Sequence, residues 1–225
     1  MAELLLELYS EEIPPQLQIT VRNQLKLIVE SSLKDKSVKH KDIQVYSSPT
    51  RLTLFIKDLP CKIVIPAKET RGPKAGSPNN ILEGFAKAKS VSKNDLYLKN
   101  IDKAQYYFAK TSAKNIFVEE LLKDILPKSL SLLSWKKSMK WSDYNLMWGR
   151  PLRSILALFN NKKLSFKFDH LETTDRAIIE QDLIVRTKRI TNFNDYSALL
   201  KTNKIILDQN EREKIILKRI SKICE

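Results

Sequence analysis

The sequence predicts an α+β fold, with mixed or antiparallel strands packed against amphipathic helices. Strand patterns and helix patterns are mixed irregularly along the chain, whereas an α/β protein alternates them strictly. A hydrophobic content of 42% over 225 residues is enough to bury a sizeable core. We expect residues 1–168 to form an α+β amino-terminal domain, and residues 169–225 to be the start of a second α+β domain.

The first quarter of the chain has the clearest local patterns. Its opening apolar run is broken only by Glu7, and the Pro14-Pro15 pair that follows suits the first turn of a helix. The next apolar residues recur at close to helical spacing, and two shorter apolar runs then flank a Ser-Ser-Pro-Thr turn. The expected elements are a strand at residues 4–9, a helix to about Lys34, and hairpin strands at residues 43–46 and 52–56.

Glycine and proline punctuate the middle of the chain. Two of the four glycines lie between residues 68 and 80, which we expect to be irregular. Ser77 and Pro78 suit the cap and first turn of a helix, and Pro127 is expected to kink or divide a later one. The expected elements are a strand at 63–65, a helix carrying Leu82 and Phe85, two strands within 96–111 around a turn at 99–102, and a helix from Asn115.

The last third begins with a hairpin and ends with a helix. An apolar run at residues 155–159 and the alternating Leu164, Phe166 and Phe168 flank its turn. Polar residues dominate from residue 169 to residue 190, so we place the domain boundary there. The expected elements beyond it are a helix near 194–201, a strand at 205–207, and a final helix without a stop signal, inside which we expect the chain to be cut.

The chain is strongly basic. It contains 40 Lys and Arg against 26 Asp and Glu, a formal net charge of +14. This charge favours a polyanionic partner such as nucleic acid. Most of these cations are Lys, so a solvated lysine surface is the alternative interpretation.

Several kinds of functional site have no counterpart in the sequence. It contains no phosphate-loop pattern, no Rossmann glycine pattern, no nucleophile elbow and no metal-type spacing of His or Cys. Cys61 and Cys224 lie far apart, which fits a reducing compartment, and no apolar run approaches the length of a membrane span. We therefore expect a cytoplasmic protein with no catalytic residue and no metal in this chain.

All three tryptophans fall within one short basic stretch, residues 135–153. Aromatic rings interleaved with Lys and Arg can stack on bases while the cations neutralise phosphate, which favours contact with RNA. Trp is also a common core residue, so packing is the alternative explanation for Trp135, Trp141 and Trp148.

Four local patterns, taken in their order and spacing, resemble one family. They are Leu4-Leu-Leu-Glu-Leu-Tyr-Ser-Glu-Glu-Ile-Pro14, Ser48-Pro-Thr-Arg-Leu-Thr-Leu54, Glu69-Thr-Arg-Gly-Pro73 followed by Gly84-Phe-Ala, and Lys137-Ser-Met-Lys-Trp141 followed by Arg150-Pro-Leu-Arg153. Together they are similar to the amino-terminal region of the β subunit of bacterial glycyl-tRNA synthetase. The chain departs from the family's pattern at residues 178–183, near which the family has a G-H-R type motif. That β subunit also continues beyond residue 225, into a helical domain and an anticodon-binding domain.

The resemblance implies a truncated or split β subunit that supports aminoacylation without carrying its chemistry. In this synthetase a separate α subunit forms glycyl-adenylate from glycine and ATP, with Mg²⁺, so no cofactor is expected in the present chain. The β subunit recognises tRNA and completes the enzyme. The implied partners are the α subunit, tRNA(Gly) and the remaining carboxy-terminal part of β, with no membrane.

The candidate tRNA contacts are basic residues of these motifs. Arg is favoured because its guanidinium can hold a phosphate through two hydrogen bonds. Pairing of Arg150 or Arg153 with Glu11 or Glu12 inside the fold is the structural alternative. A scaffold that binds only the α subunit or the rest of β, and a non-functional remnant of a split gene, are the alternative functions. The candidate residues are Lys137, Lys140, Arg150 and Arg153, with Arg51 and Arg71 as further ones.

Overall fold

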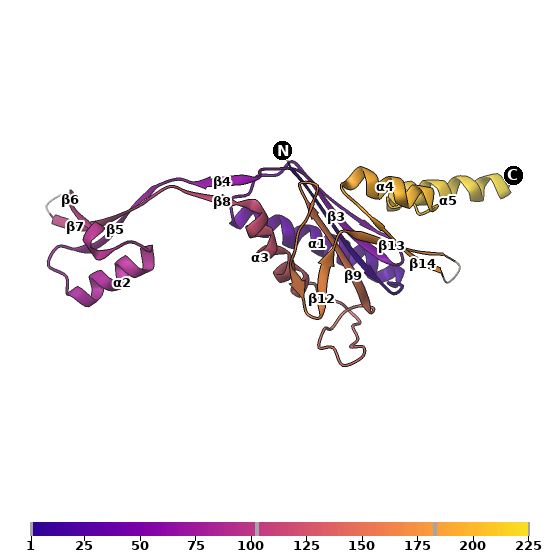
Figure 1. The fold of residues 1–225 in the computed structure, drawn as a ribbon, viewed down its shortest axis with the longest axis horizontal. Helices are drawn as coiled ribbons and strands as arrows, with labels where there is room; N and C mark the ends of the chain where they lie inside the picture. The colour runs from indigo at the N-terminus through magenta and orange to yellow at the C-terminus, as the bar shows by residue number, and fades with distance from the viewer. Residues whose placement is uncertain (1, 102–103, 182–183, 225) are drawn as a thin grey trace. The chain divides into compact units, whose positions relative to one another are not determined.

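The computed structural model describes residues 2–101, 104–181 and 184–224 and divides the chain into two units (Figure 1). The larger unit consists of Met1–Cys61 and Phe117–Glu225, and the smaller unit, Lys62–Ile116, is inserted between these two segments. Both units combine helices with strands, and parallel and antiparallel pairings occur together. The predicted α+β class is therefore confirmed.

A seven-stranded mixed sheet forms the centre of the larger unit. Its order is β11-β12-β9-β1-β3-β2, with β10 also paired to β9. The pairing of β12 with β9 is parallel, and the other pairings are antiparallel. The strands are β1 (Ala2–Ser10), β2 (Asp42–Ser47), β3 (Arg51–Leu59), β9 (Leu152–Phe159), β10 (Lys162–Lys163), β11 (Lys167–Phe168) and β12 (Leu171–Thr174).

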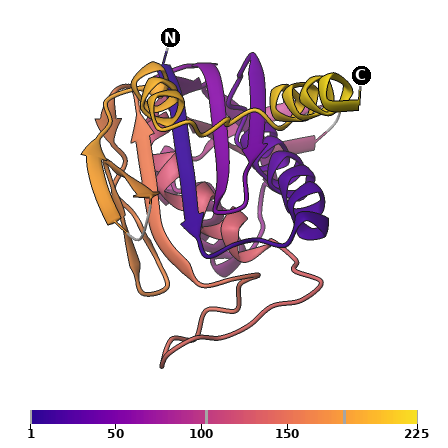
Figure 2. The ribbon, with the colours of Figure 1, turned by 90° about the vertical axis from the view of Figure 1, so that its right-hand side faces the viewer.

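Helices lie on both sides of this sheet. The helix α1 (Pro15–Asp35) buries Leu17, Val21, Leu25, Val29 and Leu33, about one residue per turn, and contacts β2, β3 and the helix α3 (Val118–Ser131). On the other side α4 (Phe193–Thr202) packs on the sheet, and Figure 2 shows α4 in front of the strands and α3 behind them. Because β1 is enclosed from both sides, its apolar run is almost continuous rather than alternating.

The segment after Phe168 belongs to the larger unit. Its strand β12 pairs with β9, and Ala177, Ile179 and Tyr196 are buried in one cluster with Leu5 of β1. The division in the structure therefore differs from the expected boundary between residues 168 and 169. The remaining elements are β13 (Arg176–Gln181), β14 (Ile184–Arg189) and α5 (Gln209–Cys224).

Two expectations for single elements are wrong. Residues 205–207 connect α4 to α5 without strand pairing among the described residues, although Leu207 is buried. The helix α3 continues through Pro127 to Ser131, so Pro127 does not divide it, and a kink there stays a prediction. That helix begins at Val118 rather than Asn115, because Lys114–Phe117 forms the strand β8.

The smaller unit is built on a three-stranded antiparallel sheet of order β5-β7-β6. The segment expected to be irregular forms β5, where a register shift between Arg71 and Lys74 accommodates Gly72 and Pro73. Ser77 does not cap the following helix; its hydroxyl donates to the carbonyl oxygen of Lys74 at 2.8 Å. Part of the expected turn at 99–102, Asp102, lies outside the described residues. The elements are β4 (Lys62–Ile65), which pairs with β8, β5 (Lys68–Lys74), α2 (Asn79–Lys89), the 3₁₀ turn Lys93–Asp95, β6 (Tyr97–Ile101) and β7 (Ala104–Thr111).

Candidate nucleic-acid interface

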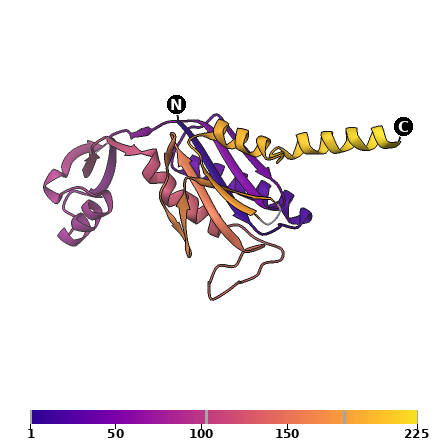
Figure 3. The same ribbon diagram turned by 45° about the vertical axis from the view of Figure 1, so that its right-hand side comes forward.

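The tryptophan-rich basic stretch forms a long loop between α3 and β9, which we call the tryptophan loop (residues 132–151). Its one bridge joins Met139 to Trp148 through two backbone hydrogen bonds, with N···O distances of 2.8 and 3.2 Å. Figure 3 shows the loop projecting from the larger unit, at the end of β9 that pairs with Ser10. The basic motif of the sequence therefore lies on a segment that protrudes from the larger unit.

Two of the three tryptophans anchor this loop to the core. The side chain of Trp148 is 2% exposed, and its ring lies 5.0 Å from that of Trp135 and 5.7 Å from that of Phe168. A Cβ atom at Gly149 would lie 2.2 Å from the Trp135 ring, so the loop passes this ring only because residue 149 is glycine. Packing accounts for Trp135 and Trp148.

The third tryptophan belongs to a more open aromatic group. Trp141 meets the imidazole of His170 edge-on at 5.8 Å, and Tyr144 stacks on the same imidazole at 3.5 Å. The carboxylate of Asp169 lies 2.9 Å from Nδ1 of His170. The side chain of Tyr144 is 41% exposed, so this group presents aromatic surface to solvent beside the loop lysines.

Lys137 and Lys140 lie on the exposed part of the tryptophan loop, together with Lys136. Within the described parts of the chain, none of these three ammonium groups forms an ion pair. Their charge is therefore available to a phosphate. Exposed, unpaired ammonium groups of this kind can contact a phosphate without first breaking an ion pair.

Arg153 is instead neutralised by carboxylates of its own unit. Its Nη1 lies 2.9 Å from Oε2 of Glu180 and 3.4 Å from Oε1 of Glu11. The hydroxyl of Tyr9 also donates to Glu180, at 2.9 Å, and this bond, followed by Arg153, lowers the pKa of Glu180. Burial, with the bond to Glu180, raises the pKa of Tyr9 to about 12. The structural alternative, in which Arg153 pairs with Glu11, is therefore the one that the structure contains.

Arg51 is a buried structural residue, 3% exposed. Its Nε lies 3.0 Å from Oε2 of Glu7, and Nη2 donates to the carbonyl oxygen of Ile178. The hydroxyl of Tyr196 donates to the same Glu7 carboxylate and lies 3.0 Å from Oγ1 of Thr53. Burial raises the pKa of Glu7 despite these partners, and burial next to Glu7 raises the pKa of Tyr196 well above its usual value. A glutamate inside a fully buried strand was the sequence signal for this network.

The remaining two candidates occupy intermediate environments. Arg150 is half-buried, and its Nη1 donates to the carbonyl oxygen of Gly149 at 3.3 Å. Arg71 is exposed in the smaller unit, where its guanidinium lies 3.6 Å from the centre of the Tyr106 ring. Within the larger unit, Lys137 and Lys140 lie on the tryptophan loop, whereas Arg51 and Arg153 form ion pairs with carboxylates.

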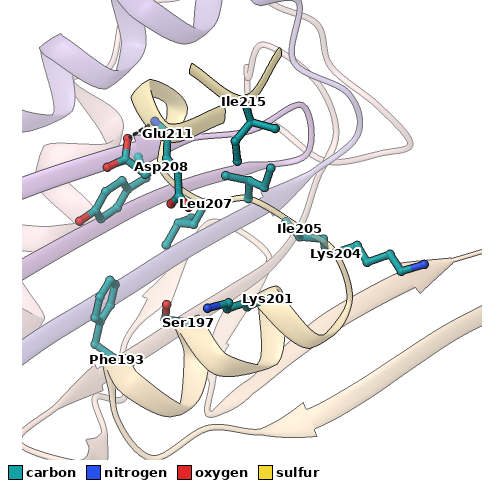
Figure 4. Close-up of a pocket in the computed structure, with 11 residues that line it drawn as sticks. Phe193, Ser197, Lys201, Lys204, Ile205, Leu207, Asp208, Glu211 and Ile215 are labelled. Atoms are coloured by element: carbon teal, nitrogen blue, oxygen red, sulfur yellow. Dashed lines mark hydrogen bonds between the residues drawn. The ribbon is translucent and has the colours of Figure 1, made fainter. Parts of the chain in front are cut away.

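A separate hollow of about 440 Å³ lies between α4 and the start of α5 (Figure 4). Phe193 and Lys201 reach it from α4, and Leu207, Asp208 and Glu211 line it from the following segment. Its lysines face a similar number of carboxylates, so it lacks the excess positive charge that RNA contact needs.

Among the described residues, no three His, Cys, Asp or Glu side chains lie close enough together to hold a metal ion. Over the same residues, no helix combines the length and apolar character needed to cross a bilayer.

Sequence comparisons point to one family. A sequence model described as "Glycyl-tRNA synthetase beta subunit" matches residues 4–225. Similar curated proteins, each described as a glycine–tRNA ligase beta subunit, occur in Rickettsia bellii (36% identity over 217 residues), Rickettsia felis (36% over 219) and Rickettsia canadensis (35% over 218). Each alignment covers 96% of this chain but 32–33% of the relative. The chain therefore spans about a third of the length of these relatives.

Proposed function

The chain belongs to the glycyl-tRNA synthetase beta subunit family, and from this premise we propose that it is a non-catalytic, tRNA-binding and assembly part of a glycine–tRNA ligase. In this role it supports the ATP-dependent attachment of glycine to tRNA(Gly) by an α subunit. The observation that carries the proposal is the family match across residues 4–225.

The tryptophan loop supports a tRNA contact in the larger unit. Two of its tryptophans, Trp135 and Trp148, are packed inward, so the loop holds a defined position, and its lysines project without carboxylate partners among the described residues. Because the backbone of the loop is already held in place, its free ammonium groups can neutralise phosphates with little loss of conformational entropy on binding. Lys137 and Lys140 are the proposed contacts, and Arg150 is a further one.

Salt dependence of tRNA binding tests this contact. Each neutralised phosphate adds roughly 0.9 to the slope of log affinity against log salt, so changing Lys137 and Lys140 to Ala should reduce that slope by about two. The matched control changes Lys162 and Lys163 to Ala. These two lysines are exposed like Lys137 and Lys140, but they lie at the β9–β10 turn. An unchanged slope in the loop variant, or an equal fall in the control, would move the contact elsewhere.

The non-catalytic part of the proposal has a direct assay. The purified chain alone should support neither glycine-dependent ATP/pyrophosphate exchange nor charging of tRNA, and both should appear when an α subunit and the rest of β are added. Exchange by the chain alone would refute this part.

A scaffold that binds only protein partners is the second candidate, and α5 favours it. The exposed side chains of this helix include Ile216, Leu217, Ile220 and Ile223, and none of its described residues is buried. Limited proteolysis should cut the isolated chain in α5 but not in β12 or α4, which are packed on the sheet, and a partner should protect α5. Protection by an α subunit combined with no tRNA binding even at low salt would favour the scaffold.

A further inference from the structure

The smaller unit carries a disproportionate share of the positive charge. Its 55 residues, 62–116, contain eleven Lys and Arg against four Asp and Glu, a net +7. That is half of the chain's net +14 on about a quarter of its length. The proposed contact at Lys137 and Lys140 uses none of this charge, because both residues lie in the larger unit.

Strand register places much of this charge on one face of the β5-β7-β6 sheet. Residues paired across antiparallel strands point to the same side. Arg71 pairs with Phe108, which pairs with Tyr97, and Lys74 pairs with Tyr106, which pairs with Lys99. Lys110 and its partner Glu69 follow on the same side. We call this side the open face.

The opposite face is covered by α2. Ala109, which points to that side, is fully buried, and α2 contacts β5 and β7 while burying Leu82 and Ala86. A Cβ atom at Gly72 would lie 2.5 Å from the ring of Phe85, so this helix packs directly on the β5 backbone. Since α2 occupies one side, no described helix of the smaller unit lies over the open face.

The open face interleaves aromatic rings with cations. The guanidinium of Arg71 lies 3.6 Å from the centre of the Tyr106 ring, and Nζ of Lys99 lies 5.4 Å from the centre of the Phe108 ring. Tyr97 packs against Phe108 at 6.1 Å between ring centres and is itself 38% exposed. The Tyr97 ring and the Arg71 guanidinium stacked on Tyr106 are thus held in place, and both are accessible to solvent.

A single acidic side chain, Glu69, lies on the three strands. It accepts a hydrogen bond from the hydroxyl of Tyr97 and lies 3.2 Å from Nζ of Lys99. These two bonds fix the positions of the ring and the ammonium group. Lys74 takes part in no ion pair of the described residues.

We propose that the open face binds single-stranded RNA, with bases stacking on Tyr97 and on the Arg71–Tyr106 pair, and with phosphates held by Lys74, Lys99 and Lys110. Exposed aromatic and guanidinium planes on a sheet accept unstacked bases, and the surrounding cations follow the backbone. Charge alone would also suit an acidic protein segment, but such a segment gives no role to the exposed rings. That this RNA is tRNA rests on the proposed function.

The stacking part is tested with the full chain and a labelled ten-nucleotide RNA, as a single strand and as a duplex. Changing Tyr97 to Ala should weaken single-strand binding roughly 5- to 150-fold, the loss expected for one stacked base, and should hardly change duplex binding. The matched control, Tyr97→Phe, keeps the ring and should bind within about twofold of the unchanged chain. No loss with alanine, or an equal loss with phenylalanine, would overturn stacking.

The phosphate part is tested by two double variants of equal charge. Changing Lys74 and Lys110 to Ala should lower the salt slope for the single strand by about 1.4, whereas changing Lys87 and Lys89 of α2 should leave it unchanged. Equal effects of the two doubles would show a diffuse charge effect and overturn the site.

A variant expected to gain affinity separates binding from folding. Glu69→Gln removes the one negative charge on the strands but keeps an oxygen that accepts hydrogen bonds. Binding should tighten roughly 1.5- to 5-fold, which a misfolded unit could not do. Weaker binding by this variant would contradict the proposal.

Two comparisons separate this inference from the proposed function. If Tyr97→Ala leaves all RNA binding intact while the Lys137 and Lys140 change abolishes it, the open face is overturned and the proposed function stands. If the open face binds the oligonucleotide but the chain does not prefer tRNA over other RNA, the proposed function fails and the inference stands. Competition by polyglutamate as strong as that by RNA would reassign the face to an acidic protein.

Discussion

The two units handle their positive charge differently. In the larger unit, Arg51 pairs with buried Glu7, Arg153 with Glu11 and Glu180, and Arg189 with Asp175. In the smaller unit, the ion pairs Lys93–Glu83 and Lys99–Glu69 both lie at the surface.

The difference follows from how much each unit can bury. The seven-stranded sheet has covered faces, and between them Arg51 and Glu7 pair out of water, although Arg153 and Arg189 stay partly exposed in their ion pairs. In the smaller unit, every described residue of β6 is exposed or half-buried. A basic composition therefore becomes a basic surface where the fold supplies few carboxylates. In this protein that condition holds on the tryptophan loop and on the open face.

The largest expected effect is on the buried pair. Changing Arg51 to Met leaves Glu7 unpaired inside the larger unit and should lower the free energy of unfolding by about 3–5 kcal/mol. Because all three tryptophans lie in the larger unit, their fluorescence during urea unfolding reports this loss. Combining Arg51→Met with Glu7→Leu should recover most of it.

The exposed counterpart is Arg71→Gln in the smaller unit. This change should lower the free energy of unfolding of that unit by less than about 1 kcal/mol, and hydrogen exchange of its amides measures the loss. A cost for Arg51→Met as small as this would remove the distinction between the two units.

Two glycines test packing in each unit. Alanine at Gly149 would clash with the Trp135 ring, and alanine at Gly72 would clash with the Phe85 ring. Each substitution should therefore lower the free energy of unfolding of its own unit by about 1–3 kcal/mol. Gly84, inside α2, has no atom within 4 Å of a built Cβ, and Gly84→Ala should stabilise the smaller unit by about 0.5–1 kcal/mol. Destabilisation by Gly84→Ala would contradict the α2 packing described here.

The smallest expected effect concerns alkaline pH. The phenol of Tyr9 ionises near pH 10.0 in the unfolded chain but near pH 12 in the folded larger unit. Rising pH through this window therefore favours the unfolded chain, and stability present below pH 10 is lost towards pH 12. Tyr9→Phe removes this proton, so the urea midpoint should fall less steeply between pH 9 and pH 11. An identical pH profile would show that folding does not raise the pKa of the Tyr9 phenol. The buried Tyr196 phenol, which acts in the same direction, remains in both proteins.

Local sequence patterns predicted the elements whose burial is regular. The apolar run of β1, the helical spacing of α1 and the hairpin of β2 and β3 all occur where expected. The strands β12, β13 and β14 were missed because they lack a regular alternation, and every described residue of β14 is exposed. A strand whose side chains face solvent carries no hydrophobic period for a sequence to display.

The candidate site shows the same limit for charge. The four motifs identified the family, and the tryptophan stretch predicted contact with RNA, which stays a prediction. The sequence could not distinguish Lys137, which is free of ion pairs among the described residues, from Arg51, whose guanidinium is buried on Glu7. Both are cations within family motifs, and the carboxylate that separates them, Glu7, lies far from Arg51 in the chain.

The sequence by itself determined the family, the α+β class, the strong positive charge and the placement of the regular helices and strands, because each depends on residue identity and short-range spacing. Only the tertiary structure decided that β12 joins the seven-stranded sheet and that α4 packs on it, that Arg51 and Arg153 are neutralised internally, and that cations and rings of the smaller unit share one uncovered face. These outcomes depend on pairings between residues far apart in the chain, such as Glu7 with Arg51 and Tyr9 with Glu180, which the folded backbone brings together.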